Sequence, residues 1–371
     1  MKTIYTSGVF DLLHESHIRA LRAAKEQGKN VYFIVGVATD EDTMMYKRRP
    51  IIPYEQRLKM IESLDFVDKV ITAPLFTCRQ FYDLYNIDIH VQGEDDAGTI
   101  DYYKGGKEIG IMKFIGRDPI ESTTSCIQKL HQIVGSDYTV TPLHGGISNM
   151  VWKLKSPNAK QAYVLKYLQS STVESFSKKH DCIIIGGTFA LYEYIDGVVG
   201  NVTSNQMIEY FLDKMKHHKT LINGDKVSKD NVFSGLMRYL NKDDDVILDQ
   251  IELYKKIFDS NCLWHWSHND LVRDNIIISN GEIKLIDWEY AELAPFEMDI
   301  ASCIANGVID LSTVCKHDFN LDLIITLTVF QCLIWIRWYE KNNDKMDKNA
   351  YMSYVNTYNQ FLDMCINNHA E

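Results

Sequence analysis

The sequence predicts an α/β chain of two domains: an N-terminal doubly wound parallel sheet and a C-terminal α+β domain. Its 371 residues are too many for one ordinary domain and suit two. In the first third, apolar runs alternate with stretches of helical periodicity, which is typical of parallel strands joined by crossover helices. Near residue 280, an apolar run, an Asn-Gly pair and an alternating run predict a β-hairpin in a different kind of domain.

Each element of the first third has its own pattern. The run Val31–Val37 is continuously apolar, as in a strand covered on both faces. The other elements alternate between strand and helix: strands at Lys2–Tyr5, 70–71 and Ile87–Val91, and helices at Ile18–Gln27, Tyr54–Leu64 and Cys78–Tyr85. Because ligands of such sheets lie beyond the carboxyl ends of the strands, we expect Gly8–His17 and Gly93–Asp96 to bind the ligand.

Two histidines, His14 and His17, stand at the expected mouth of the first helix. Backbone N–H groups at a helix N-terminus bind phosphate, and imidazoles can donate to charge that grows in a transition state. Taken alone, two histidines at this spacing are more often incidental. Their place directly after a strand favours a polyphosphate site.

The run GVFDLLHESH resembles the G-x-F-D-x-x-H-x-G-H signature of cytidylyltransferases that act on phosphocholine, phosphoethanolamine or glycerol 3-phosphate. The run RDPIESTT resembles their R-T-x-G-I-S-T-S segment, and the strand leading to Lys47 and the run YEQR resemble two further motifs. These motifs lie in order across residues 3 to 130. The resemblance implies a Rossmann-like nucleotidyltransferase domain over residues 1–132, with a homodimer through this domain as one possibility.

By this resemblance, His14 and His17 hold the CTP phosphates, while Lys47 and Arg117 neutralise charge on the phosphates of both substrates. It also implies nucleotide-binding roles for Gly8, Phe10, Asp11, Gly93, Asp95, Ser122, Thr123 and Thr124. Ser16 departs from the pattern, because the family has glycine between the histidines, and Glu121 departs from it where G-I-S-T would be tighter. If the backbone at Ser16 needs a positive φ, serine would be strained there.

A second polar cluster surrounds the predicted hairpin, whose strands are 275–279 and Glu282–Ile286. The hairpin fixes the separation between the run His268-x-Asp270-x4-Asn275 and Asp287. Phosphoryl transfer needs such a set, in which an aspartate accepts the proton of an alcohol and oxygen ligands hold Mg²⁺ on the ATP phosphates. The alternative is a solvated hairpin with incidental acids.

These residues resemble the choline/ethanolamine kinase and aminoglycoside phosphotransferase family, whose catalytic loop reads H-x-D-x4-N followed by I-D-[WF]-E. The resemblance covers residues 138–371 and implies a protein-kinase-like phosphotransferase fold. By this resemblance Asp270 is the catalytic base, and Asn275 and Asp287 are the magnesium ligands. Glu289 and Asp299 resemble the acids that follow the motif in choline kinases.

The part before the hinge at Leu191–Gly197 resembles the ATP-binding lobe of such kinases, but it is short. The resemblance implies that a glycine turn covers the ATP phosphates with Gly146, Ser148 and Asn149. It also implies that Lys166 contacts the α/β-phosphates; an edge-strand lysine facing water is the alternative. Few residues separate Lys166 from the hinge, so the N-lobe is predicted to be abbreviated. Glu174 is the acidic candidate to pair with the lysine; the alternative is a lobe that positions ATP weakly.

Trp335 and Trp338 lie three apart and therefore share one face of a predicted late helix. Aromatic faces attract quaternary ammonium groups, and a tryptophan pair in a late helix is a choline-site feature of choline kinases. Glu289 would add negative charge to such a site. Plain hydrophobic core is the alternative for the two tryptophans.

Composition excludes several classes of protein. The net charge of −11 argues against nucleic-acid binding. The eight cysteines form no CxxC pair, which favours reduced thiols in the cytoplasm. The N-terminus lacks the apolar stretch of a signal peptide, and the apolar run Leu323–Ile336 is too short to span a bilayer, so it predicts a buried helix and no transmembrane segment.

Both halves point to one pathway with small-molecule substrates. A kinase that phosphorylates choline or ethanolamine makes the monoester that such a cytidylyltransferase couples to CTP, so the sequence predicts synthesis of a CDP-amino alcohol from ATP and CTP with Mg²⁺. One alternative is an active cytidylyltransferase with a degenerate kinase-like module that binds or regulates. Another is a kinase for a different alcohol. The sequence leaves choline and ethanolamine both open.

Overall fold

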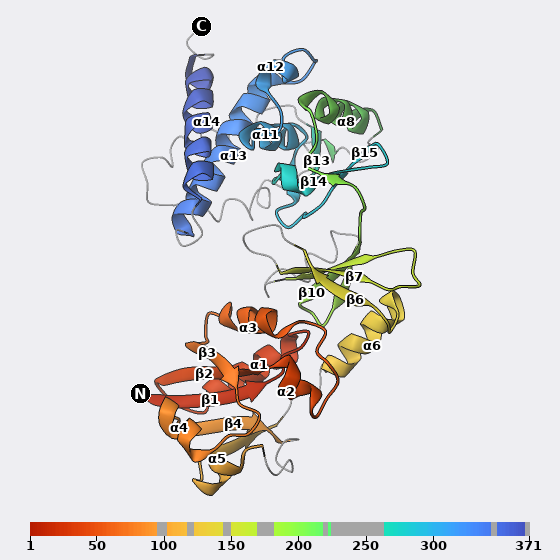
Figure 1. Cartoon of the computed structure of the whole chain (residues 1–371). Helices are drawn as coiled ribbons and strands as arrows, with labels where there is room; N and C mark the ends of the chain where they lie inside the picture. The colour runs from red at the N-terminus through yellow and green to blue at the C-terminus, as the bar shows by residue number, and fades with distance from the viewer. Residues whose placement is uncertain are drawn as a thin grey trace. The chain divides into compact units, whose positions relative to one another are not determined.

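The computed structural model describes residues 1–94, 102–116, 122–143, 150–168, 182–217, 222–223, 263–342 and 347–367 (Figure 1). Its contacts divide the chain into two compact units, Met1–Tyr194 and Ile195–Glu371, which we describe separately. The sequence placed a domain boundary between residues 132 and 138. The contact boundary falls later because the sheet that follows residue 138 shares a hydrophobic core with the sheet before it.

The first unit begins with a five-stranded parallel sheet in the order β3-β2-β1-β4-β5. Its strands are β1 (Lys2–Gly8), β2 (Val31–Ala38), β3 (Lys69–Ala73), β4 (Ile89–Gly93) and β5 (Met112–Ile115). Its helices are α1 (Glu15–Lys25), α2 (Asp40–Met44), α3 (Tyr54–Glu62), α4 (Arg79–Tyr85), α5 (Lys104–Glu108) and α6 (Thr123–Val134). The predicted Rossmann-like fold is confirmed.

Helices cover both faces of this sheet, with α1 and α3 on one side and α4 and α5 on the other (Figure 1). Successive side chains of β1 point to opposite faces, as strand geometry requires. Ile4 packs in the cluster that contains Leu21 of α1, whereas Tyr5 packs in the cluster that contains Tyr82 of α4. This is the doubly wound arrangement that the continuous apolar strands predicted.

A second, antiparallel sheet completes the first unit, in the order β6-β7-β8-β10-β9. Its strands are β6 (Thr139–Pro142), β7 (Val151–Lys155), β8 (Tyr163–Tyr167), β9 (Ile183–Ile185) and β10 (Phe189–Glu193). One hydrophobic cluster joins Leu13 and Leu130 to Trp152 and Phe189, so the two sheets share a core. Glu174 lies outside the described residues, and the abbreviated lobe stays a prediction.

The second unit contains two three-stranded sheets, in the orders β11-β14-β15 and β12-β13-β16. Within each sheet, neighbouring strands are antiparallel. Their strands are β11 (Val198–Val199), β12 (Ile222–Asn223), β13 (Leu263–Ser267), β14 (Ile276–Ser279), β15 (Glu282–Leu285) and β16 (Glu292–Pro295). The helices are α8 (Ser204–His217), α11 (Glu297–Ala305), α12 (Leu311–Val314), α13 (Leu321–Lys341), α14 (Lys348–Asn367) and a 3-10 turn, η4 (Arg273–Asn275).

The predicted hairpin is confirmed as β14 and β15. Its turn residues Asn280 and Gly281 have φ values of 51° and 82°, as a two-residue primed turn requires. The register pairs Ile276 with Leu285, so the hairpin brings the residues that flank it together at one end. This pairing sets up the polar cluster described below.

Helix α13 contains the apolar run that predicted a buried helix. Within the described part of the chain it is the one helix long and apolar enough to cross a membrane, but 78% of its most apolar window is buried inside the protein. Such burial is typical of a core helix. Its residues pack with α11 and α14 in the main hydrophobic core of the unit.

Candidate active sites

The chain leaves β1 through a tight loop. Phe10 and Leu12 adopt left-handed conformations, with φ values of 53° and 46°. The ring of Phe10 lies over Gly8, where a Cβ atom would come within 2.9 Å of the ring. A side chain at position 8 would have to displace this ring. The loop delivers His14 to the N-cap of α1.

The two histidines stand face to face at this helix mouth. The rings of His14 and His17 stack with centroids 3.8 Å apart, and His14 Nε2 lies 3.3 Å from Thr123 Oγ1 at the start of α6. His14 is 3% exposed, and burial lowers its pKa to about 4, so the ring is neutral at neutral pH. Its Nδ1 atom and the hydroxyl of Ser16 are buried without a hydrogen-bond partner among the described residues. Polar atoms buried in this way favour a ligand at the site.

Ser16 lies in the first turn of α1 and outside the left-handed region. The strain that serine would suffer at a positive φ therefore does not arise. Replacement of the family's glycine by serine leaves the helix mouth intact.

Asp11 holds the loop that follows α2. Its buried carboxylate accepts hydrogen bonds from Arg48 NH2 at 2.8 Å and from the backbone N–H groups of Ile51 and Ile52 at 2.9 and 3.0 Å. These three donors face its two oxygens from within the protein. In this structure, Asp11 acts by fixing the walls of the site.

Arg57 is a residue whose role the sequence did not reveal, although the run YEQR drew attention to it. It is fully buried and donates to the carbonyls of Val9 at 2.5 Å and Ile52 at 2.9 Å and to Asp40 Oδ1 at 2.6 Å. Arg57 thus ties the loop after β1 to the loops after β2 and α2. A fully buried arginine with three such partners is a positioning residue.

The remaining predicted residues of this site lie around the carboxyl edge of the sheet. Ser122 caps α6 by accepting a hydrogen bond from the Ser125 N–H at 3.1 Å, and Thr124 follows in the first turn. Gly93 ends β4, and Lys47 lies in the exposed loop after α2. Asp95 and Arg117 lie outside the described residues.

The catalytic loop of the second unit is held by its own hydrogen bonds. His268 Nε2 lies 2.7 Å from the Ile286 carbonyl and donates to it, while His268 Nδ1 accepts from the Asp270 N–H at 3.3 Å. Burial lowers the pKa of His268, which suits this neutral tautomer. Asn275 Nδ2 donates to the Asp270 carbonyl at 2.8 Å and to Asp270 Oδ2 at 3.1 Å. The asparagine thereby orients the carboxylate of Asp270.

The hairpin places Asp287 next to this loop. The Ile286 N–H donates to the Asn275 carbonyl at 2.9 Å, so Asp287 follows directly after the residue paired with Asn275. Asp287 adopts a left-handed φ of 63°, which turns the chain away at the strand end. Because the amide nitrogen of Asn275 is engaged, its oxygen is the atom left to bind a cation. An amide oxygen and a carboxylate are hard ligands of the kind that Mg²⁺ takes together with substrate phosphates.

Asp299 holds the loop from behind. It is fully buried and accepts from the backbone N–H of His268 at 2.7 Å, while its other oxygen lies 3.7 Å from Lys214 Nζ. The sequence marked Asp299 only as an acid that follows the motif. In the structure, Asp299 binds the backbone of the catalytic loop. This contact joins residues that are 31 positions apart in the chain.

Trp335 and Trp338 belong to an aromatic cluster beside the catalytic loop. Their ring centroids are 5.9 Å apart, and Trp335 also contacts Tyr290 at 5.2 Å and Tyr354 at 6.3 Å. Trp335 is 7% exposed, and its Nε1 atom is buried without a partner among the described residues. Burial, and after it the negative charge of Asp270, raises the pKa of the Tyr354 hydroxyl, which places this cluster near Asp270.

Glu289 links the loop to this cluster through its neighbours. The ring of Trp288 lies 4.7 Å from that of His268, and Tyr290 contacts Trp335. Glu289 lies between Trp288 and Tyr290 in the sequence, and its side chain is half-buried. The segment 288–290 therefore connects the catalytic loop to the aromatic cluster, and the proximity of the Glu289 carboxylate to the rings stays a prediction.

Lys166 lies on β8, between β7 and β10, and is 5% exposed. The edge-strand alternative is therefore wrong, because β8 is an inner strand. Gly146, Ser148 and Asn149, which were predicted to cover the ATP phosphates, lie outside the described residues.

Comparisons with known proteins match the N-terminal and C-terminal parts of the chain to two different families. The family model for cytidylyltransferase-like proteins matches residues 5–219, and the one for choline/ethanolamine kinases matches residues 201–368. An ethanolamine-phosphate cytidylyltransferase of Dictyostelium discoideum is 32% identical over 204 residues, which are 51% of this chain and 56% of its own length, so the chain spans little more than half of that relative. A glycerol-3-phosphate cytidylyltransferase of Staphylococcus aureus is 36% identical over 132 residues, which are 35% of this chain and 96% of its own.

Among solved structures, a choline kinase from Streptococcus pneumoniae covers 66% of this chain and 98% of its own at 17% identity, with a TM-score of 0.45. The two family matches, taken with the parallel sheet and the catalytic loop, settle the classification. The chain belongs to the cytidylyltransferase-like family and carries a choline/ethanolamine kinase domain in its C-terminal half.

Proposed function

We propose that the chain phosphorylates choline with ATP and then transfers CMP from CTP to the phosphocholine, releasing ADP and pyrophosphate. The observation that carries this proposal is the pairing of Asn275 with Asp270 in a chain that also presents the His14–His17 pair. The product of the first reaction is the substrate of the second. Two complete reactions of one pathway therefore explain why these domains are fused.

In the first reaction, the hydroxyl oxygen of choline attacks the γ-phosphorus of ATP, and ADP leaves. Asp270 accepts the proton of that hydroxyl. Asn275 keeps the carboxylate of Asp270 directed by its hydrogen bond at 3.1 Å. Mg²⁺ held by the oxygens of Asn275 and Asp287 would neutralise phosphate charge during this step. His268 and Asp299 keep the backbone of the loop in place.

In the second reaction, an oxygen of phosphocholine attacks the α-phosphorus of CTP, and pyrophosphate leaves. No base is needed, because the monoester is already ionised at neutral pH. His14 and His17 donate hydrogen bonds to phosphate oxygens as charge grows. Lys47 and Arg117 are proposed to neutralise the phosphates, and Ser122 and Thr123 to bind them at the start of α6.

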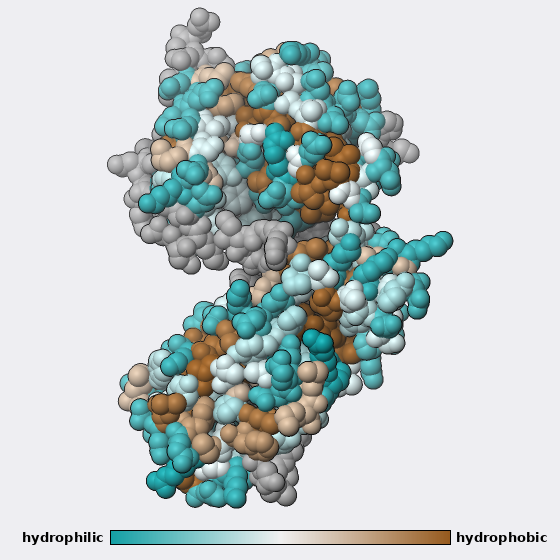
Figure 2. Space-filling view, in the orientation of Figure 1, coloured by the Kyte–Doolittle hydropathy of each residue, from teal (hydrophilic) through white to brown (hydrophobic). Residues whose placement is uncertain are grey.

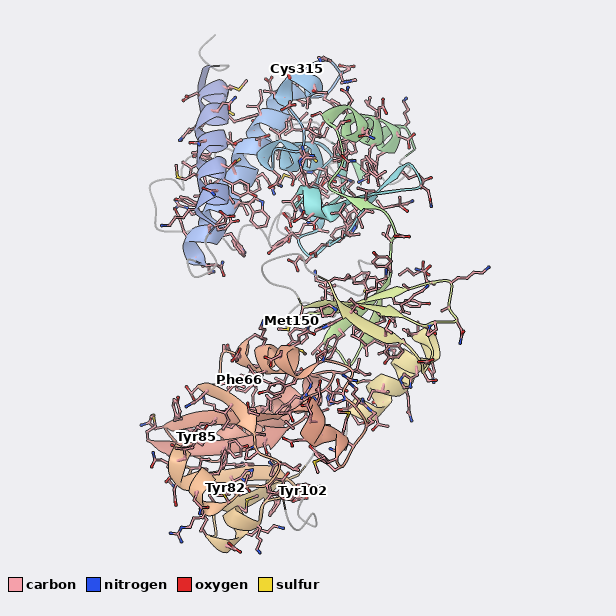
Figure 3. The ribbon with its side chains drawn as sticks, in the orientation of Figure 1. Phe66, Tyr82, Tyr85, Tyr102, Met150 and Cys315 are labelled. Atoms are coloured by element: carbon pink, nitrogen blue, oxygen red, sulfur yellow. The ribbon has the colours of Figure 1, made fainter. Side chains whose placement is uncertain are left out.

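Aromatic clusters at both sites favour choline over ethanolamine. In the kinase domain, Trp335 and its partners form an aromatic surface near Asp270. In the first domain, Tyr102 contacts Tyr46 and stacks on Phe76, with ring centroids 5.4 Å apart in both pairs. Tyr46, Phe76 and Tyr102 each follow the carboxyl end of a strand, and Figure 3 shows Tyr102 on the side of the sheet away from the N-terminus. Aromatic faces bind quaternary ammonium by cation–π attraction.

These exposed rings sit on an otherwise mixed surface. On the face of the first unit shown in Figure 2, hydrophobic residues form small groups separated by hydrophilic ones. Phe76 is 57% exposed and Tyr46 39%. Aromatic side chains exposed at the ligand edge of a parallel sheet suit a small ligand with an apolar cation.

We propose the cytoplasm as the location of the enzyme and Mg²⁺ as its cofactor.

The half-reactions test this proposal separately. With phosphocholine and CTP, we expect pyrophosphate release, and with choline and MgATP, ADP formation; phosphoethanolamine and ethanolamine should react less efficiently in the same assays. A chain that releases pyrophosphate but forms no ADP from either alcohol would support the alternative of a degenerate kinase-like module. A chain that releases no pyrophosphate would contradict the proposed nucleotidyl transfer.

A further inference from the structure

The antiparallel sheet of the first unit reaches the histidine pair of the parallel sheet. Thr188 lies in the turn between β9 and β10 and is 1% exposed. Its hydroxyl donates a hydrogen bond to the carbonyl of Leu13. That carbonyl belongs to the peptide bond that joins Leu13 to His14. The hydroxyl therefore fixes the peptide from which His14 enters α1.

Gly186, in the same turn, allows this close approach. It adopts a left-handed φ of 62°, and a Cβ atom there would lie 3.0 Å from Cys126 Sγ and 3.2 Å from His14 Cβ. Both distances are tighter than ordinary van der Waals contact, so a side chain would push against the histidine. The turn is seated directly on His14 and on α6.

The turn is also anchored on both sides. Lys129 Nζ of α6 donates to the Ile184 carbonyl at 2.6 Å, and the Leu168 N–H donates to the Thr188 carbonyl at 2.7 Å. Thr123, at the start of α6, lies 3.3 Å from His14 Nε2. The turn thus contacts both elements whose polar atoms line the helix mouth, and it leads into β10, which pairs with the strand that carries Lys166.

We propose that Thr188 is a positioning residue for nucleotidyl transfer, although it belongs to the sheet that carries the kinase lysine. This inference rests on the proposed reaction of phosphocholine with CTP. By holding the Leu13 carbonyl, Thr188 sets the position of His14, whose buried Nδ1 atom has no hydrogen-bond partner in the described part of the chain. The antiparallel sheet is then part of the cytidylyl-transfer site as well as of the kinase domain.

The test is Thr188→Val in the full chain, which removes the hydroxyl at nearly constant size. We expect kcat for pyrophosphate release from CTP and phosphocholine to fall about 10-fold, because small displacements of a catalytic group are costly. The KM for phosphocholine should stay unchanged, and Thr188→Ser should restore kcat to within about twofold, because it restores the donor. ADP formation from choline and MgATP should stay at the wild-type rate in both variants.

Thr139→Val is the matched control, since the Thr139 hydroxyl also donates to a carbonyl of the same sheet, that of Lys155 at 3.2 Å, but far along the sheet from the turn. A wild-type kcat for Thr188→Val overturns the inference. So does a fall that serine fails to restore, or one matched by Thr139→Val or by an equal loss of ADP formation, because each indicates a purely structural role. An inactive wild type would instead overturn the proposed nucleotidyl transfer, and the inference with it.

Discussion

The two candidate sites differ in how the protein holds the groups that are proposed to react. In the kinase domain, polar groups are bonded to one another: Asn275 to Asp270, His268 to Ile286, and Asp299 to the backbone of His268. At the helix mouth of the first domain, His14 keeps a buried nitrogen that has no hydrogen-bond partner among the residues that the structure describes. One site is preorganised around a carboxylate, and the other presents a buried imidazole nitrogen to which a ligand can bind.

This difference suits the chemistry of the two proposed steps. A base that accepts a proton must be oriented before the substrate arrives, so its supports are internal. A site that stabilises growing negative charge uses hydrogen-bond donors. A donor that is already bonded to another protein group cannot donate to the ligand. The two sites should therefore respond differently when single groups are removed.

Asp270→Asn should have the largest effect, since it removes the proton acceptor and leaves the loop geometry. We expect kcat for ADP formation with choline to fall about 10³-fold, while pyrophosphate release from CTP and phosphocholine stays unchanged. Asp274→Asn is the matched control, because Asp274 is exposed in the same loop. An Asp270→Asn enzyme with normal ADP formation would show that this loop is not the catalytic one.

His17→Asn should have the next largest effect and on the other reaction. Loss of a donor to the phosphates should lower kcat for pyrophosphate release about 10²-fold, with ADP formation unchanged. The control is His131→Asn, which changes a histidine of α6 near its other end. Equal losses in His17→Asn and His131→Asn would remove the helix mouth from the mechanism.

Trp335→Leu sharpens the comparison at the level of substrate choice. We expect the KM for choline to rise about 10-fold, because the loss of a desolvated cation–π contact weakens binding by roughly tenfold or more. The KM for ethanolamine should rise less, since a primary ammonium is more strongly hydrated. If both values rise equally, the cluster is hydrophobic core and does not recognise the quaternary group.

The pH dependence of stability tests the buried state of His14 and is the smallest effect. Its pKa of about 4 in the folded chain lies below the ordinary 6.5, so the unfolded chain binds more protons between these values. This contribution to stability is present above pH 6.5 and is lost as the pH falls toward 4. His14→Asn should therefore reduce the slope of unfolding free energy against pH in this window by at most about 1.4 kcal/mol per pH unit, as measured by urea titrations. Identical slopes would show that the imidazole is solvated.

The sequence predicted what local patterns control. The Asn280-Gly281 turn and its alternating strands specify the hairpin, and that hairpin determines where Asn275 and Asp287 meet. The apolar run Val31–Val37 likewise predicted an inner strand of the parallel sheet, which lies in β2. Element boundaries moved by a few residues because caps and frayed ends depend on contacts outside the element.

What the sequence missed depends on contacts between distant segments. Arg57 reaches the carbonyl of Val9, and Asp299 reaches the backbone of His268, although neither pair is close in the chain. The same holds for Thr188 and Leu13, which join the two sheets of the first unit. No periodicity or motif reports such pairs, because only the folded chain brings them together. The roles of Asp95, Arg117 and the 144–149 turn stay predictions.

The most direct test of the central claim starts from free choline. Purified enzyme receives choline, MgATP and CTP, and phosphorus NMR follows the products over time. We predict that phosphocholine forms first and CDP-choline then accumulates, whereas Asp270→Asn yields CDP-choline only when phosphocholine is supplied. A wild-type enzyme that makes CDP-choline from phosphocholine but never from free choline would contradict the account of a bifunctional enzyme.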